Sequence, residues 1–141
     1  MSKRILIING PNLNLVGTRQ PEIYGNLSMD TFIKELREKN KPHEIAYYQS
    51  NIEGELINKI QLCSTNYHGL VINAGAYTHT SIAIGDALAS AGLPCIEVHI
   101  SNIAARESFR HTSFLTPHCK GLIMGFGLAG YQMAVHFLIS Q

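Results

Sequence analysis

The sequence predicts an α/β fold, a three-layer α/β/α sandwich built on a five-stranded parallel sheet. Two observations carry this prediction. Short apolar segments alternate along the chain with segments of helical period, and strands that alternate with helices form parallel sheets covered on both faces. The first segment, Arg4 to Asn9 (RILIIN), is apolar without alternation, which is typical of a central strand buried from both sides.

The first half of the chain is expected to hold two strands and two helices. A long loop without helical or strand period follows the strand at 4–9 and extends to Gly25. Ser28 can cap the next helix, whose apolar residues at positions 29, 32, 33 and 36 share one face and which ends at 40–42. The second strand is expected at 43–49, and a second helix from about Asn51.

The second half repeats the pattern. Strands are expected at 69–73, 94–99 and 121–124, and helices at 80–91 and 128–139. Gly-Leu-Pro at 92–94 ends the first of these helices, and the polar stretch at 101–117 leaves room for a short one. Five strands in this sequence most commonly adopt the flavodoxin-like order 2-1-3-4-5.

Composition narrows the class of protein. At 141 residues the chain is long enough for one domain with a real core, so we expect a single domain over 1–141. The net charge is +1 without a basic block, which argues against a nucleic-acid or acidic-membrane partner. No apolar run reaches the ~18–20 residues of a membrane span, and no signal peptide precedes the first strand, so we expect a cytoplasmic protein. The cysteines, without CxxC spacing, are expected to be reduced, buried thiols: Cys63, Cys95 and Cys119.

The expected winding also predicts where a ligand binds. Ligands lie outside the carboxyl ends of the strands, at the switch between strands 1 and 3. The most polar segments follow strands 1, 3 and 4, so they should meet in one crevice: 9–12, 73–80 and 97–102. Asn73, at the end of an apolar strand, supplies an amide there that can bind a hydroxyl or a carbonyl.

The helix after the third strand offers two further candidates. His79 stands with Thr80 and Ser81 where this helix is expected to start, so capping of the helix is the simpler interpretation of the three. Asp86 lies about two turns into an otherwise apolar helix (SIAIGDALASA). A solvated charge is the simpler interpretation of Asp86, and a functional carboxylate is the alternative.

Glu97 and His99 form a pair at the end of the fourth strand. Residues two apart on a strand face the same side, so the carboxylate can orient and charge the imidazole. An imidazolium held in this way is a general acid. A histidine satisfied by ordinary packing at a strand end remains the alternative.

The long loop carries Arg19 and Tyr24. Taken alone, Arg19 would most simply be a surface residue, and Tyr24 would most simply be packed against the protein. Together they suggest a base, because a phenol has a solution pKa of about 10 and acts at neutral pH only where a cation stabilises the phenolate. Arg19 is such a cation on the same loop, and Arg110 is another from elsewhere in the chain.

These groups suit removal of a proton next to a carbonyl, with loss of a leaving group β to it. None of the six lysines falls in these motifs, which argues against an imine intermediate. Gly125–Gly130 matches GxGxxG, but no βαβ unit or acidic residue follows, so a tight turn with close helix packing is the better interpretation. A flavodoxin-like binding or signalling module is the alternative function. It is disfavoured because the acidic residues and lysine of a phosphoryl switch are missing at the strand ends.

Four motifs resemble those of the type II 3-dehydroquinate dehydratases. The run from Asn9 to Gly25 (NGPNLNLVGTRQPEIYG) is similar to the N-terminal motif of that family. The second and third motifs match at 73–81 (NAGAYTHTS) and 98–102 (VHISN), and the fourth at 106–111 (RESFRH). The match covers nearly the whole chain, in order.

The resemblance implies a hydro-lyase that converts 3-dehydroquinate to 3-dehydroshikimate by anti elimination of water through an enolate. This is the third step of the shikimate pathway, which serves aromatic amino-acid biosynthesis. The resemblance further implies that no metal or organic cofactor takes part. It also implies a homo-oligomer, a dodecamer built from trimers.

The matching motifs imply the chemical roles. Tyr24 is the base that takes the C2 proton, and Arg19 lowers its pKa. Asn12 helps to hold a water at the enolate oxygen. His99, paired with Glu97, protonates the departing C1 hydroxyl.

The same motifs imply the residues that bind substrate. Backbone N–H groups of Ile100 and Ser101 hold the substrate carboxylate. Four side chains bind hydroxyls and order the site, one of them, Asp86, from a neighbouring subunit: Asn73, His79, Asp86 and Arg110.

Overall fold

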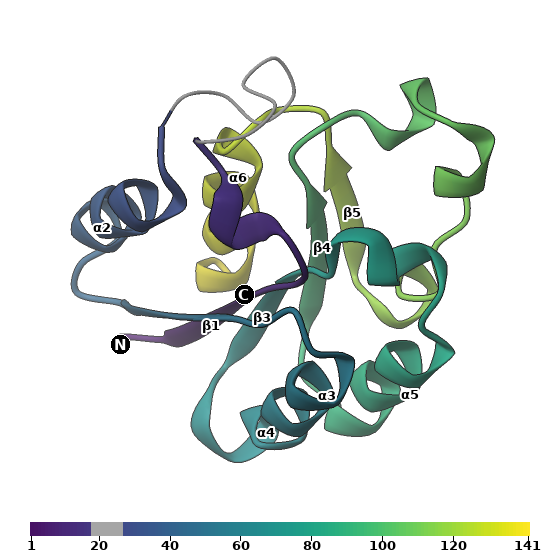
Figure 1. Ribbon diagram of the computed structural model, residues 1–141. Coiled ribbons are helices and arrows are strands. Elements are labelled where there is room, and N and C mark those ends of the chain that lie inside the picture. Colours follow the sequence, from purple (N-terminus) through teal and green to yellow (C-terminus); the bar gives the residue numbers. More distant parts are fainter. Residues whose placement is uncertain (18–26) are drawn as a thin grey trace.

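A single parallel sheet organises the structure, a computed structural model that describes residues 1–17 and 27–141. Its strands follow the predicted order, β2-β1-β3-β4-β5 (Figure 1). Every expected strand is present, with bounds that differ by at most one residue: β1 (Arg4–Asn9), β2 (Glu44–Gln49), β3 (Gly69–Asn73), β4 (Cys95–His99) and β5 (Gly121–Met124). The predicted fold class is therefore confirmed.

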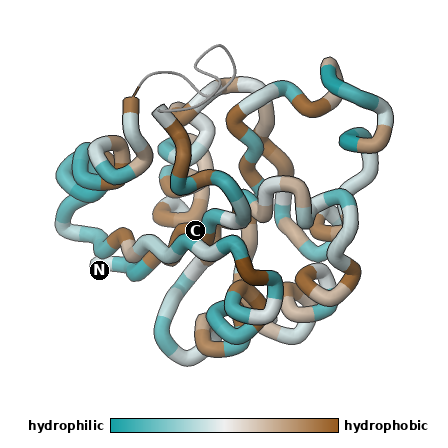
Figure 2. The backbone as a smooth tube through the Cα atoms, viewed as in Figure 1, coloured by the Kyte–Doolittle hydropathy of each residue, from teal (hydrophilic) through white to brown (hydrophobic). Residues whose placement is uncertain are grey.

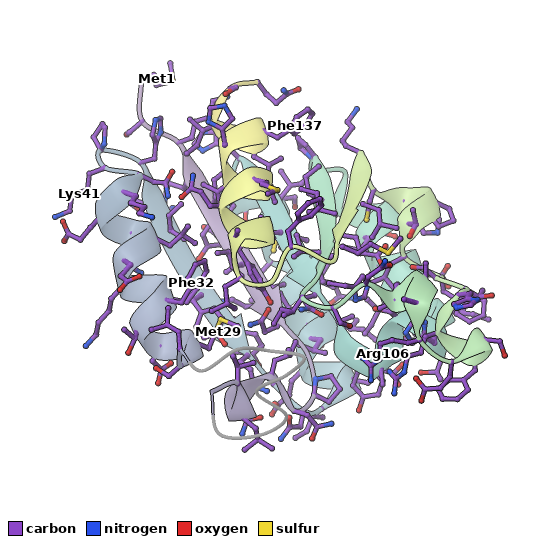
Figure 3. The ribbon with its side chains drawn as sticks, turned by 90° about the horizontal axis from the view of Figure 1, so that it is seen from above. Met1, Met29, Phe32, Lys41, Arg106 and Phe137 are labelled. Carbon is purple, nitrogen blue, oxygen red and sulfur yellow. The ribbon has the colours of Figure 1, made fainter. Side chains whose placement is uncertain are left out.

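Helices cover both faces of the sheet: α2 (Met29–Lys39), α3 (Glu53–Gln61), α4 (Cys63–Asn66), α5 (Ile82–Ala91) and α6 (Ala129–Ile139). α2 and α6 lie on one face, and α3 to α5 on the other (Figure 1). Alternation along β1 divides the core, because Ile5 and Ile7 join the cluster beneath α2 and α6 while Leu6 and Ile8 join the cluster beneath α3 and α5. Brown and teal alternate around the helices in Figure 2, as expected when each helix buries one side. In Figure 3, Met29 and Phe32 mark the side of α2 that faces the rest of the molecule.

The structure places two expected helix starts more exactly and shows what the polar stretch after β4 contains. The second helix begins at Glu53, because the Asn51 side-chain oxygen accepts from the Asn12 N–H (3.0 Å) and does not cap a helix. The helix after β3 begins at Ile82 and not at residue 80, since Ser81 is its cap and accepts from the Ile84 N–H at 2.9 Å. The polar stretch after β4 holds three short 3₁₀ turns: η3 (Ile103–Ala105), η4 (Ser108–Arg110) and η5 (Thr116–His118).

Close backbone packing joins the ends of β1 and β3. The Gly10 N–H donates to the Asn73 carbonyl at 2.7 Å. A Cβ atom on Gly10 would lie 2.4 Å from the Ala74 carbonyl oxygen, so only glycine fits between the two segments. This contact places the residues that follow both strands at one edge of the sheet.

The glycines of the GxGxxG match form a turn, as expected. Gly125 and Gly127 have φ values of 93° and 62°, which favour glycine. A Cβ atom on Gly130 would lie 3.3 Å from Val98 Cγ1, so α6 packs closely on the sheet at this point.

The three cysteines are free thiols. Cys63 and Cys95 are buried as expected, and burial raises the pKa of Cys63 to about 11. Cys119 is only half-buried and lies 3.8 Å from Cys95, sulfur to sulfur. Among the described residues, no helix combines the length and the apolar character needed to cross a membrane.

Candidate active site

A crevice of about 270 Å³ opens at the carboxyl ends of β1, β3 and β4. Its position confirms that the polar segments after these strands meet. The lining includes six of the predicted site residues: Asn12, Asn73, His79, His99, Ser101 and Arg110. A cavity of this size, with a few convergent polar groups, suits a small molecule.

Three other predicted residues, all in the described part of the chain, do not line this crevice. Glu97 is fully buried behind His99, and Ile100 is buried next to Ser101. Asp86 lies on the exposed side of α5. Arg19 and Tyr24 lie outside the described residues.

Glu97 and His99 are in direct contact, as their spacing on β4 predicts. The His99 Nε2 atom lies 2.5 Å from Glu97 Oε2, and the side chains are 5% and 0% exposed. A carboxylate only accepts hydrogen bonds, so Nε2 carries a hydrogen. Nδ1 is then the nitrogen available to the crevice that His99 lines.

The Glu97 carboxylate has further donors from a distant segment. Thr116 Oγ1 donates to Oε1 at 2.5 Å, and Ser113 Oγ lies 3.1 and 3.2 Å from the two oxygens. Burial alone would raise the pKa of Glu97, but the hydrogen bonds from His99, Thr116 and Ser113 outweigh it. The pKa therefore lies below the usual 4.5, and Glu97 is a buried carboxylate at neutral pH.

A chain of neutral groups holds Asn73. Its Nδ2 donates to the Tyr131 hydroxyl at 2.9 Å, and its Oδ1 accepts from the Gly75 N–H at 3.1 Å. The Tyr131 hydroxyl donates in turn to Asn9 Oδ1 at 2.7 Å, and Asn9 Nδ2 donates to the Tyr47 hydroxyl at 3.3 Å. These contacts fix the plane of the Asn73 amide and leave one amide hydrogen for the crevice.

His79 lies parallel to His99. Their ring centroids are 6.3 Å apart with an interplanar angle of 19°. The Thr112 carbonyl oxygen is 2.8 Å from His79 Nδ1, so Nδ1 carries a hydrogen and donates it. His79 does not cap α5, since Ser81 does, and its Nε2 is left for a ligand in the crevice that it lines.

Asn12 has an unusual backbone conformation. Its φ of 70° lies in the left-handed region, where asparagine is tolerated better than most residues. The Asn12 N–H donates to Asn51 Oδ1, which also accepts from Gln49 Nε2 at 3.1 Å. Strained residues of this kind are concentrated at functional sites.

Two lining residues, Arg106 and Glu107, were not among the predicted site residues. Arg106 Nη1 donates to Ser101 Oγ at 3.2 Å, and Arg110 Nε donates to Glu107 Oε1 at 3.0 Å. A hydrogen bond from its own backbone, followed by that from Arg110, holds the pKa of Glu107 below its usual value. Both residues stand in the fourth motif, RESFRH at 106–111, which was the available sequence signal. Figure 3 shows Arg106 on the side of the molecule away from α2.

The crevice thus combines an imidazole on a buried carboxylate, a second imidazole, two amides, two guanidinium groups and the Glu107 carboxylate that pairs with Arg110. The amides and Nε2 of His79 can bind hydroxyls, and the guanidinium groups favour an anion. His99 can deliver a proton from Nδ1. Among residues 1–17 and 27–141, no three His, Cys, Asp or Glu side chains are grouped to hold a metal ion.

Comparison with known proteins identifies the family. The family model described as dehydroquinase class II matches residues 3–139. A 3-dehydroquinate dehydratase of Dinoroseobacter shibae is 56% identical over 133 residues, which cover 93% of this chain and 89% of the relative. The crystal structure of the type II dehydroquinase from Butyrivibrio crossotus has a TM-score of 0.94 at 51% identity and 97% coverage of both chains. That from Propionibacterium acnes has a TM-score of 0.94 at 43% identity, with 100% and 99% coverage. The chain therefore belongs to the class II dehydroquinase family.

Proposed function

We propose that the chain is a 3-dehydroquinate dehydratase of type II, a hydro-lyase. It removes water from 3-dehydroquinate by anti elimination through an enolate and gives 3-dehydroshikimate, the third step of the shikimate pathway. The observation that carries the proposal is the buried Glu97–His99 pair, whose imidazole lines a crevice of amides and guanidinium groups. An elimination of water requires a general acid that protonates the departing hydroxyl, and this imidazole can serve as that acid.

His99 supplies the acid. The protonated imidazole gives its Nδ1 hydrogen to the departing C1 hydroxyl, which leaves as water. The buried carboxylate of Glu97 keeps Nε2–H engaged, so the ring is held by one nitrogen and reacts through the other.

Tyr24 supplies the base, and Arg19 stabilises its phenolate. A phenolate at neutral pH requires such a cation, because the ordinary pKa of tyrosine is about 10. Asn12 holds the water that stabilises the enolate oxygen, and its position in the lining supports this assignment.

The substrate carboxylate binds the backbone N–H groups of Ile100 and Ser101, next to Arg106 and Arg110. The substrate hydroxyls bind Asn73 and His79, and Arg110 orders the site. All but Ile100 line the crevice, which supports their assignment. Asp86 acts from a neighbouring copy of the chain, because its exposed position on α5 leaves it available to another subunit.

The functional assembly is a dodecamer built from trimers, in which each chain is a single catalytic domain over 1–141. Exposed apolar side chains on β5, the turn after it and α6 support burial against other copies. They are Leu122, Phe126, Met133 and Phe137, which are 36%, 60%, 43% and 42% exposed. β5 is also an edge strand, which proteins usually cover. A cytoplasmic location fits the three free thiols, since reducing compartments maintain them.

Incubation of the purified protein with 3-dehydroquinate tests this function. The product carries a carbon–carbon double bond conjugated to the ketone, so ultraviolet absorbance should rise as it forms. Tyr24→Phe should lose at least ~10²-fold in turnover, while Tyr67→Phe, whose ring contacts Arg4 away from the crevice, should not. Substrate binding without turnover by the unaltered protein would favour a binding module and exclude the enzyme.

A further inference from the structure

The segment that follows η4 supplies two hydroxyl groups that hydrogen-bond to the buried carboxylate of Glu97. Ser113 and Thr116 lie 16 and 19 residues from Glu97, yet both hydroxyls contact its carboxylate. Neither residue is in the lining of the crevice. They therefore contact Glu97 without lining the space that a substrate would occupy.

The contacts around the Glu97 carboxylate determine which of these groups donates and which accepts each hydrogen bond. Ser113 Oγ accepts from the Leu115 and Thr116 N–H groups at 3.0 and 3.1 Å. Its single hydrogen is then directed to Glu97, because a hydroxyl has one hydrogen to donate. Thr116 also donates to Glu97, since an ionised carboxylate has only acceptor sites.

Glu97 thus receives hydrogens from three side chains and has none to offer. Thr116 donates to Oε1, and Ser113 Oγ lies within reach of both oxygens, while Oε2 also faces His99 Nε2. A neutral His99 must then carry its hydrogen on Nε2 and present the lone pair of Nδ1 to the crevice. When His99 is charged, Nδ1 holds the hydrogen that it delivers.

Packing holds the two hydroxyls in place. Leu115, between them, is fully buried in the core cluster beneath α3 and α5. The Phe114 N–H donates to the Thr78 carbonyl at 3.0 Å. The Phe114 carbonyl oxygen would lie 2.4 Å from a Cβ on Gly85, so the segment rests directly on α5. Removal of one hydroxyl group should therefore leave the packing of this segment and its remaining hydrogen bonds unchanged.

We propose that Ser113 and Thr116 are positioning residues of the reaction, which keep Glu97 ionised and oriented and so fix the nitrogen through which His99 donates its proton. They act through Glu97 and not on substrate. The proposal rests on the proposed function for its kinetic consequences. Its statement about the His99 tautomer can be checked without substrate.

The kinetic test compares Thr116→Val, which keeps the shape and loses the hydroxyl, with Thr116→Ser, which keeps the hydroxyl. A hydrogen bond to a charged group corresponds to roughly 10–100-fold in rate. Thr116→Val should lower kcat by about 10-fold or more with little change in KM, whereas Thr116→Ser should retain most of the turnover. Equal losses in both variants, or a change confined to KM, would overturn the proposal.

A double-mutant cycle separates positioning from a general structural effect. In a Glu97→Gln background, Thr116→Val should cause little additional loss, because its effect passes through the carboxylate. The same fractional loss in both backgrounds would show that Thr116 acts independently of Glu97. Absence of turnover in the unaltered protein would instead refute the proposed function.

Nitrogen-15 NMR of histidine-labelled unaltered protein provides the substrate-free test, and a variant is needed only to assign the His99 signal. The neutral His99 ring should show hydrogen on Nε2 and a lone pair on Nδ1. Neutral His99 with its hydrogen on Nδ1 would overturn the proposal whatever the kinetics show. His99→Gln assigns the signal.

Discussion

The two polar ends of the crevice are anchored from opposite faces of the sheet and by different chemistry. Asn73, on β3, is held from the α6 side by neutral groups, the Tyr131 hydroxyl and the Asn9 amide. His99, on β4, is held from the α5 side by a buried carboxylate that accepts hydrogens from Ser113 and Thr116. We call the first set the amide anchor and the second the carboxylate anchor.

The difference indicates what each anchor contributes. Neutral hydrogen bonds orient a binding group and do not change charge between pH 4 and 8, so the amide anchor should affect mainly stability and substrate binding. A buried carboxylate also sets where protons reside, so the carboxylate anchor should affect mainly the chemical step. The predictions below test this division.

Glu97→Gln should produce the largest effect, a loss of ~10²-fold or more in kcat, because the amide cannot stabilise the charged imidazole of His99 as a carboxylate does. Steady-state kinetics measure it, and circular dichroism checks that the variant is folded. Glu44→Gln is the matched control, since Glu44 pairs with Arg4 at the exposed start of β1. A near-normal kcat for Glu97→Gln would remove the carboxylate from the mechanism.

Tyr131→Phe should lower the free energy of unfolding by ~1–3 kcal/mol, because Asn73 Nδ2 and Asn9 Oδ1 both lose a buried partner. Urea denaturation measures the change, with Tyr67→Phe as the control. Any kinetic loss should appear more in KM than in kcat, since Asn73 binds substrate. A kcat loss as large as that of Glu97→Gln would erase the distinction between the two anchors.

The pH dependence of stability should also separate them. The folded-state pKa of Glu97 lies below its unfolded value of 4.5, so its stabilisation is fully present above that pH. As the pH falls further, the unfolded chain binds the proton first, and the stabilisation is lost through the folded-state pKa. The stability difference between the unaltered protein and Glu97→Gln should therefore shrink on acidification below 4.5.

Tyr131→Phe provides the contrast, because the amide anchor contains no group that titrates in this range. Its decrement in unfolding free energy should be the same at neutral pH and on acidification. Denaturation curves at a series of pH values, recorded for both variants, give the comparison. Parallel behaviour of the two variants would contradict the assignment of a buried carboxylate to only one anchor.

The sequence predicts that Asn73 and His99 lie at the crevice, but it does not predict most of the distant side chains that hold them there. Asn73 and His99 each end an apolar strand, so their place at the crevice follows from the strand pattern and the winding. The strand runs themselves are strong enough to locate all five strands within one residue. Tyr131 lies 58 residues from Asn73, and Thr116 lies 19 from Glu97. Such partners leave no periodic signal, because only the packed fold decides which distant hydroxyl reaches a buried group.

Local hydrogen bonds and short turns explain why the sequence did not predict the exact start of α3 or two of the lining residues. Asn51 resembles a helix cap, but its side-chain oxygen is engaged by Asn12 and Gln49, so α3 begins later. Arg106 and Glu107 stand in a polar stretch where a solvated position is the usual outcome. The short 3₁₀ turns η3 and η4 flank and hold them at the crevice, and turns of this length have little sequence signature.

Gly54→Ala should produce the smallest effect, a gain of ~0.5 kcal/mol in unfolding free energy with unchanged kcat and KM. Gly54 lies in the first turn of α3, and a Cβ atom there would meet nothing within 4 Å. The gain comes from the smaller conformational freedom of alanine in the unfolded chain, so it should not depend on pH. Urea denaturation and steady-state kinetics test both parts. Because α3 begins two residues after Asn51, the partner of the Asn12 N–H, a change in KM would mean that this helix end is a third anchor of the crevice.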